Sequence, residues 1–201
     1  QAQFPGPIIH FTGNGGGRHY SIQPRPQAAH RDCRGVLIEG THEPLAIYGL
    51  NSEKSYAPKE TELPSGKVRQ WQDANSILTN VEIAHARNVR IYSMKREGSG
   101  ASLIVRDSQN IALFSSGAMR NPSHPGLGGY IQVLGKSQNI LASTIIVQHV
   151  KSLDAKPGER EEPLLREALD GQKEIAIEWP ESLSLYKLGN LDDSVFARNG
   201  I

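Results

Sequence analysis

The chain has 201 residues, of which 37% are hydrophobic and 21% are charged. This balance is typical of a globular chain that is long enough to bury one substantial core. The 22 basic residues nearly match the 21 acidic ones, whereas nucleic-acid binders usually carry a basic excess for phosphate contacts. No apolar run approaches the roughly 18 residues of a membrane span. We therefore expect neither nucleic acid nor a membrane as a partner.

Residues 1–35 are rich in glycine and proline and are expected to form irregular or edge structure. The opening QAQFPGPIIH has neither the basic nor the apolar region of a signal peptide. The stretch GNGGGR (13–18) looks superficially like a phosphate loop, but it lacks the GK[ST] ending, and HYSIQPRP after it does not favour a helix. Tight turns or a close backbone approach explain these glycines better.

The middle of the chain contains copies of one repeat, at 81–93 (VEIAHARNVRIYS), 103–115 (LIVRDSQNIALFS) and 132–144 (QVLGKSQNILAST). Each copy is a strand-like run rich in Val, Ile and Leu, a polar turn that ends in Asn, and a second strand-like run. An earlier copy at 36–49 (VLIEGTHEPLAIYG) has Pro44 at the Asn position. The spacing between these runs leaves no room for the crossover helices of an α/β fold.

The recurring turn residues are Asn88, Asn110 and Asn139. A tight turn between two strands often requires the left-handed backbone region, which Asn tolerates. Asn side chains stacked on one another are able to hydrogen-bond from copy to copy, because the amide carries both donors and an acceptor. The sequence therefore predicts an all-β fold, a right-handed parallel β-helix (solenoid) that is a portion of a longer helix.

Two stretches interrupt the repeat, at 52–75 and 119–129, and we expect loop insertions there. Residues 1–150 are expected to form the coils with their lead-in, and 151–201 to complete the same domain.

The C-terminal part is expected to begin with a connecting loop and a short helix within EEPLLREALDG (161–171), ended by Gly171. Two strands are expected after it, at 174–179 and 182–189. They would form either a terminal coil or a cover over the exposed end.

The segments GNGGGRHY, RGVLIEGTHEPLAIYGLNSE, ARNVRIYSMKREG and IVRDSQNIALFSSG resemble bacterial proteins of the pectate-lyase-like β-helix superfamily. LAIYGLNSEK is similar to a segment of glycoside hydrolase family 55, with Lys54 where those relatives often have His. The resemblance covers about residues 13–150. It implies a secreted or periplasmic protein that acts on an extracellular polysaccharide. The superfamily also contains lyases, tailspikes and adhesins, so fold alone does not select the chemistry.

Alignment of the copies at their turn places Glu53 beside Glu97 in the next coil. Neighbouring strands lie roughly 4.8 Å apart, and a retaining glycosidase places its two carboxyl groups about 5–5.5 Å apart. This pair favours glycoside hydrolysis, with one group as acid/base and the other as nucleophile. The alternative is that both are surface carboxylates paired with Lys54, Lys95 or Arg96.

Lys95 and Arg106 suggest a second chemistry, a polysaccharide lyase that neutralises a uronate with one cation and uses a Lys as base. The alternative is that both are solvated surface charges.

Aromatic residues Tyr48, Tyr92 and Phe114 occupy equivalent positions and are expected to stack in a row. We favour a row that packs inward in the core. An outward row would instead contact a polysaccharide, with Tyr48, Tyr92 and Asn51 as binding residues.

No metal site is predicted, because the seven histidines show no HxH or HExxH spacing and the single cysteine excludes a paired-cysteine site. No cofactor is expected, although calcium held by backbone carbonyls would leave no trace in the sequence. Two classes of function stay open: a carbohydrate-active enzyme, and a non-catalytic carbohydrate-binding or structural β-helix of the adhesin or tailspike kind. The strand edges at the helix ends predict a partner segment or a homo-oligomer.

Overall fold

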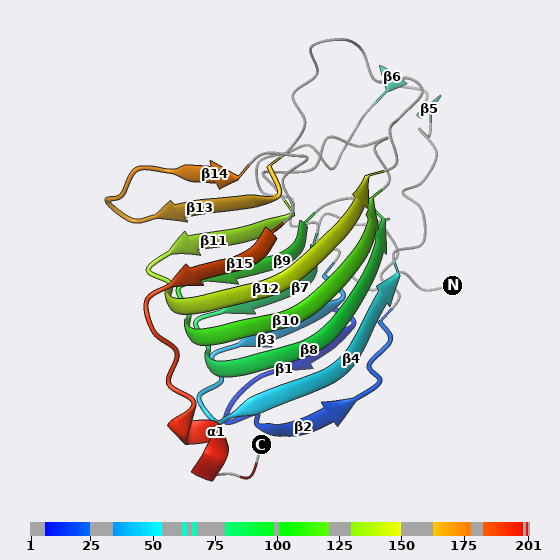
Figure 1. Cartoon of the computed structure of the whole chain (residues 1–201). Coiled ribbons are helices and arrows are strands. Elements are labelled where there is room, and N and C mark those ends of the chain that lie inside the picture. The colour runs from blue at the N-terminus through cyan, green and yellow to red at the C-terminus, as the bar shows by residue number, and fades with distance from the viewer. Residues whose placement is uncertain are drawn as a thin grey trace.

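The computed structural model describes residues 7–24, 34–53, 62–63, 66–67, 79–98, 101–120, 130–149, 163–177, 183–198 and 200. In these ranges the chain is mostly β-structure, in two large sheets packed face to face (Figure 1). The predicted all-β class is therefore confirmed. Among the helices of the described residues, none has the length and apolar character to cross a membrane.

Each large sheet has its strands in a fixed spatial order. The first sheet contains β1 (Ile9–Phe11), β3 (Val36–Glu39), β7 (Thr79–Ala84), β9 (Ala101–Arg106), β11 (Ile131–Gly135), β13 (Leu165–Leu169) and β14 (Ile175–Ile177). The second contains β2 (Gly17–Tyr20), β4 (Leu45–Glu53), β8 (Arg87–Gly98), β10 (Gln109–Arg120), β12 (Gln138–His149) and β15 (Leu183–Leu188). The short strands β5 (Glu62–Leu63) and β6 (Gly66–Lys67) pair antiparallel, and α1 spans Ser194–Arg198.

The chain passes back and forth between the two sheets, so that β3 is followed by β4, β7 by β8, β9 by β10, and β11 by β12. We call each such pair of strands a tier. Strands of neighbouring tiers pair in parallel in both sheets. Equivalent residues of successive repeats therefore lie beside one another along the stack.

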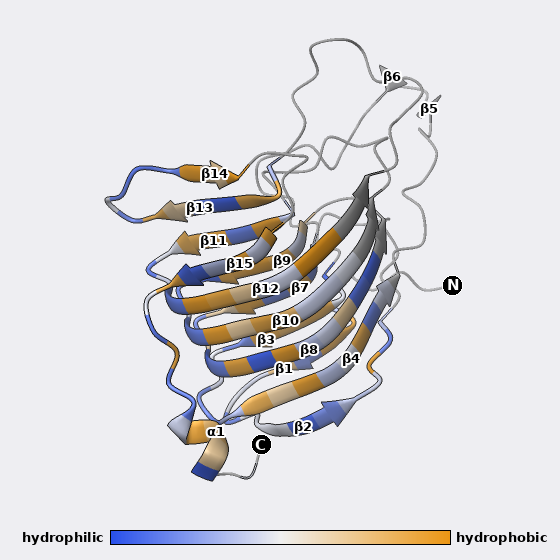
Figure 2. Cartoon of the chain, viewed as in Figure 1, coloured by the Kyte–Doolittle hydropathy of each residue, from blue (hydrophilic) through white to orange (hydrophobic). Residues whose placement is uncertain are grey.

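The hydrophobic core fills the space between the sheets. Alternate residues of a strand point inward, and in β8 the inward pair Val89 and Ile91 is fully buried. Val81 and Ile83 of β7 face them from the other sheet. The same alternation recurs from strand to strand, as the hydropathy colours show (Figure 2).

The turn alignment predicted from the sequence is confirmed. Asn88, Asn110 and Asn139 have φ values of 59°, 59° and 55°, in the left-handed region. Each precedes a residue that pairs with its equivalent in the next tier, and Leu45 after Pro44 pairs with Val89 in the same register. The amide Nδ2 of Asn110 donates to Oδ1 of Asn88 at 2.8 Å, so one step of the predicted ladder is formed.

The early glycines make the predicted close approach. A Cβ on Gly16 would lie 2.8 Å from Cβ of Glu43 in the next tier, and Gly13 and Gly17 have φ values of 69° and 92°. The described part of the lead-in contains the short edge strands β1 and β2 and irregular residues around them, as expected.

The C-terminal part covers one end of the stack. β14 pairs antiparallel with β13, and β15 pairs antiparallel with β12, which confirms a covering element. The helix predicted within 161–171 is wrong, because Leu165–Leu169 form strand β13 instead. Leu165 and Leu169 are four residues apart, a spacing that places them on one side of a strand as well as of a helix. Residues 165–169 form a strand because they pair in parallel with β11, whose edge would otherwise be open.

Candidate functional site

Each long strand of the second sheet bends near its middle, at a residue with positive φ. These residues are Gly49 (71°), Ser93 (59°), Ser115 (60°) and Thr144 (55°). The bend divides the outer face of this sheet into two legs with different side chains.

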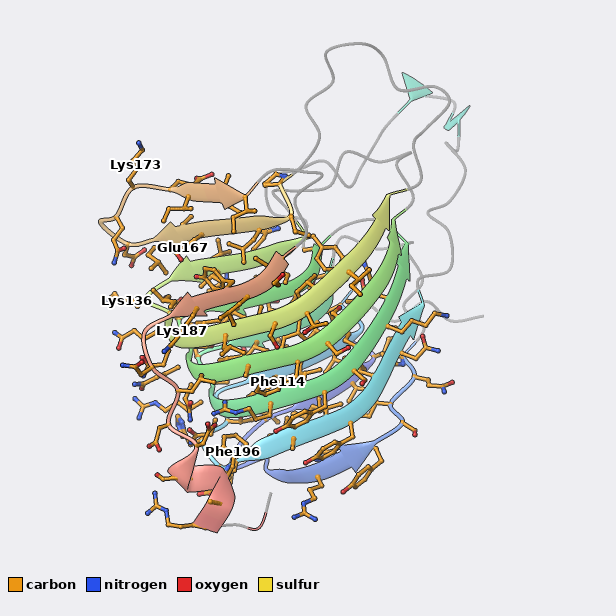
Figure 3. All side chains as sticks on the ribbon, viewed as in Figure 1. Phe114, Lys136, Glu167, Lys173, Lys187 and Phe196 are labelled. Carbon is orange, nitrogen blue, oxygen red and sulfur yellow. The ribbon has the colours of Figure 1, made fainter. Side chains whose placement is uncertain are left out.

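On the first leg, four aromatic rings form a row that we call the aromatic ladder: Tyr20, Tyr48, Tyr92 and Phe114. Their ring centroids are 5.0, 4.8 and 5.0 Å apart, and the planes lie within 13° of parallel. Tyr20 is 62% exposed, and Phe114 lies on the outer side of the sheet (Figure 3). The predicted row is therefore confirmed, but the favoured inward direction is wrong, because the rings lie outside the core.

In β4 the inward positions near the ring belong to aliphatic residues. Ile47 and Leu50 flank Tyr48 and are buried in the core. Alternation after Ile47 places the Tyr48 ring outside, and the bend at Gly49 shifts the alternation so that Leu50 turns inward again. Burial of the Tyr92 hydroxyl raises its pKa, and electrostatic repulsion from Tyr48 raises this pKa further.

On the second leg, Asn51, Lys95, Gly117 and Ile146 lie in register on successive strands and form what we call the outer strip. Lys95 is exposed, and Ile146 is 69% exposed. Asn51 is half-buried, and its backbone N–H donates to the carbonyl of Ile22 at 2.9 Å. Ser52 and Arg96, the next residues after Asn51 and Lys95, turn inward and are completely buried.

The predicted carboxylate pair lies at the ends of β4 and β8. Glu53 and Glu97 are direct register partners on these two parallel strands, so the predicted backbone alignment is confirmed. Their side chains lie outside what the structure describes. Both positions follow the outer strip by two residues along their strands, which is one full period of a strand.

Arg96, which we considered as a surface partner of these carboxylates, is instead an interior residue. Its Nε donates to Oδ1 of Asn80 at 3.0 Å, and Asn80 in turn donates to Oγ of Ser52 at 2.7 Å. The guanidinium lies 5.3 Å from the ring centroid of Tyr130. This buried polar group ties β8 to β7 near the ends of the long strands.

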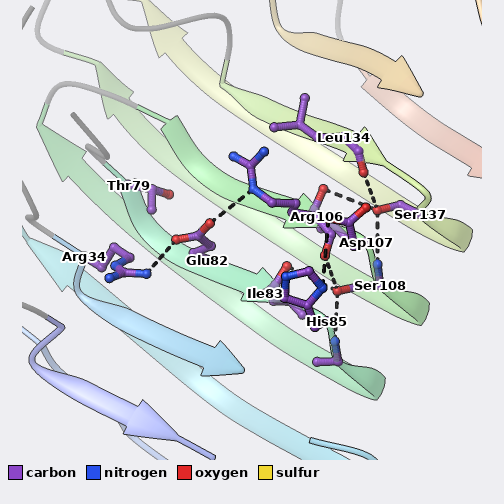
Figure 4. Close-up of polar contacts among 12 residues, drawn as sticks. Arg34, Thr79, Glu82, Ile83, His85, Arg106, Asp107, Ser108, Leu134 and Ser137 are labelled. Atoms are coloured by element: carbon purple, nitrogen blue, oxygen red, sulfur yellow. Dashed lines mark hydrogen bonds and ion pairs between the residues drawn. The ribbon is translucent and has the colours of Figure 1, made fainter. Parts of the chain in front are cut away.

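Arg106 does not join Lys95. Lys95 lies on β8 of the second sheet, whereas Arg106 lies on β9 of the first. The Nε of Arg106 is 3.6 Å from Glu82, whose other carboxylate oxygen accepts a hydrogen bond from Arg34 at 3.0 Å (Figure 4). The Glu82 side chain is 4% exposed. A buried carboxylate between two guanidinium groups is a structural ion cluster that offsets the cost of its own burial.

Polar side chains also mark the turn of the first sheet. His85 and Asp107 lie at equivalent turn positions, 3.9 Å apart, and Asp107 accepts a hydrogen bond from the backbone of Lys136 at 2.8 Å. Ser108 accepts from the backbone of Ala86 at 3.1 Å, and its own N–H donates to Oγ of Ser137 at 3.3 Å (Figure 4). These contacts satisfy turn backbone from tier to tier. Within the described ranges no group of three or more metal-ligating side chains occurs.

Comparison with known protein families, with curated proteins and with solved structures finds no match to this chain. The functional assignment therefore depends on the geometry of the outer face.

Proposed function

We propose that the tiers are coils of a right-handed parallel β-helix of the pectate-lyase-like superfamily, and that the protein acts on an extracellular polysaccharide by glycoside hydrolysis. The alternation of strands between sheets, the parallel register and the equivalent left-handed turns support the fold proposal. A polymer substrate outside the cell would require a secreted or periplasmic enzyme.

The pairing of Glu53 with Glu97 is the observation that carries the catalytic proposal. Neighbouring parallel strands place in-register residues about 4.8 Å apart. Carboxyl groups that project from such positions would have the separation of about 5–5.5 Å that suits a retaining mechanism. One carboxyl group would protonate the leaving oxygen while the other attacks the anomeric carbon.

The test is hydrolysis of a panel of neutral and acidic polysaccharides, read both as new reducing ends and as ultraviolet absorbance of unsaturated products. We expect Glu97→Gln and Glu53→Gln each to lower the rate by roughly 10²–10⁴. Glu43→Gln is the matched control, because Glu43 is an exposed carboxylate of this stack that lies outside the proposed pair. If Glu97→Gln leaves hydrolysis unchanged, the proposed mechanism is wrong.

A lyase would release unsaturated products instead, and their ultraviolet absorbance would indicate elimination in place of hydrolysis. The proposed Lys95 and Arg106 pair receives no support from their positions, since the two residues lie on different sheets. An elimination activity would therefore need a base other than this pair.

A non-catalytic carbohydrate-binding or structural role is the second candidate. The aromatic ladder favours its structural form, because the stacked rings join successive tiers. Binding without product release, retained in Glu97→Gln, would select this role.

A further inference from the structure

The C-terminal segment 191–198, which we call the strap, runs along one side of the second sheet, across β10 and β8. It starts beyond β15, which pairs with β12 at one end of the sheet. It then contacts Asn110 on β10 and Arg90 on β8. Close behind it, a Cβ on Gly200 would lie 3.7 Å from Arg18 on β2, the strand at the opposite end. Figure 1 shows this course, from β15 down one side of the sheet to α1 at the lower end of the stack.

Arg90 is the residue on which the strap closes. It lies between the inward residues Val89 and Ile91, so its side chain leaves the core on the outer face, yet it is only 1% exposed. Its Nη2 is 2.8 Å from Oδ1 of Asp193, and its guanidinium lies 4.2 Å from the ring centroid of Phe196. A cation so fully removed from water requires such partners.

The strap also hydrogen-bonds to the turn residue Asn110. Asn110 donates through Nδ2 to the carbonyl of Asp192 at 2.7 Å, and its Oδ1 accepts from the N–H of Asp192 at 3.0 Å. The same Oδ1 accepts from Arg90 at 2.9 Å, while Nδ2 also donates to Asn88. One side chain therefore links two tiers and the strap.

The two ends of the stack are unequal. The antiparallel strands β14 and β15 cover the C-terminal end. At the N-terminal end, β1 and β2 are the outermost strands of their sheets, and most of their residues are exposed or half-buried. In a stack whose units touch only their neighbours, unfolding begins at the weaker end and proceeds unit by unit.

We infer that the strap is a clamp that couples the N-terminal tiers to the covered C-terminal end, so that the stack opens as one unit instead of fraying from β2 upward. The contacts of Arg90 with Asp193 join residues 103 apart in sequence, far beyond the reach of tier-to-tier contacts. Because the strap is anchored through β15 and closes on β8, fraying from the N-terminal end cannot pass β8 without breaking the strap's contacts.

The test is native-state hydrogen exchange of the full chain, resolved by peptide. In the double variant Asp193→Asn/Phe196→Ala, we expect amides of β4 and β8 to exchange at least tenfold faster, with a much smaller change in β12. The matched control is Asp170→Asn/Leu185→Ala, which changes an exposed Asp and a 59% exposed apolar side chain in the same C-terminal region. We expect no difference between β4 and β12 in the control.

Equal acceleration in β4 and β12, or none in β4, would overturn the inference and reduce the strap to a local contact. If the double variant does not fold, Asp193→Asn alone decides, because Asn keeps the size of the side chain and removes its charge. It must then show the same preference for β4 and β8 over β12, with a smaller factor.

Discussion

Asn110 and Asn139 occupy equivalent turn positions, and we predict that replacing Asn110 by glycine destabilises the protein far more than the same change at Asn139. Both residues have the left-handed backbone that glycine adopts without strain, with φ of 59° and 55°. Asn110 is 4% exposed and hydrogen-bonds to Asn88, Arg90 and Asp192. The side chain of Asn139 makes no hydrogen bond to the part of the chain that the structure describes.

The magnitude follows from the hydrogen bonds of the Asn110 amide, which are 2.7 to 3.0 Å long. Each contributes about 1 kcal/mol net, and removal leaves buried partners unsatisfied. We therefore expect Asn110→Gly to lower the free energy of unfolding by about 3–5 kcal/mol. The extra freedom of glycine in the unfolded chain applies equally at Asn139 and accounts for about 0.5–1 kcal/mol there. Asn110→Ala should cost about 1 kcal/mol more than Asn110→Gly, because alanine is strained at positive φ.

The assay is urea unfolding followed by far-ultraviolet circular dichroism, with the slope of each transition compared to identify variants that change more than stability. Equal losses for Asn110→Gly and Asn139→Gly would refute the reasoning, since the backbone requirement would then account for the whole effect. A loss for Asn110→Ala no larger than that for Asn110→Gly would show that the left-handed turn is not held in place.

Two other groups give direct predictions. The Tyr186 hydroxyl donates a hydrogen bond to the buried Glu167 carboxylate and joins β15 to β13, so Tyr186→Phe should lower the free energy of unfolding by about 1–3 kcal/mol, measured by urea unfolding against the exposed Tyr20→Phe. Arg166 lowers the pKa of the Glu174 carboxyl through a hydrogen bond, with their Coulomb attraction second. The stabilisation from a lowered folded pKa is present above the unfolded pKa of about 4.3 and is lost as the pH falls through the folded pKa. Glu174→Gln should therefore flatten the fall in melting temperature on acidification. An unchanged slope would contradict this.

The sequence was sufficient to predict what the repeat itself determines. Three Asn at one turn position required a left-handed backbone, and their spacing predicted the register that pairs Tyr48 with Tyr92 and Glu53 with Glu97. Such inferences succeed because stacked tiers repeat one local environment, so each copy supports the alignment of the others.

What the sequence could not predict depends on contacts between distant segments. Arg90 lies between apolar residues in the run VRIY. A charged residue that alternates with inward-facing apolar residues in a strand usually faces water. It is buried because Asp193 and Phe196, more than a hundred residues later, cover it. Arg106 looked equally available for catalysis, but Glu82 takes it into an ion cluster. The residues around Arg90 and Arg106 in the sequence do not indicate these distant partners.

The aromatic ladder changes which surface a polysaccharide would use. A sugar ring lies with its apolar side against the face of an aromatic ring, but the rings of Tyr48 and Tyr92 have their faces turned to each other at 4.8 Å. This stacking stabilises the tiers by about 0.5–1.5 kcal/mol for each pair of rings. Tyr20 and Phe114 end the ladder, and each lacks a further ladder ring on one side. Beyond Phe114 lies β12, with Ser143 in register. Direct contact with a polymer would therefore fall to the outer strip with Lys95, next to the carboxylate positions, and away from the ladder.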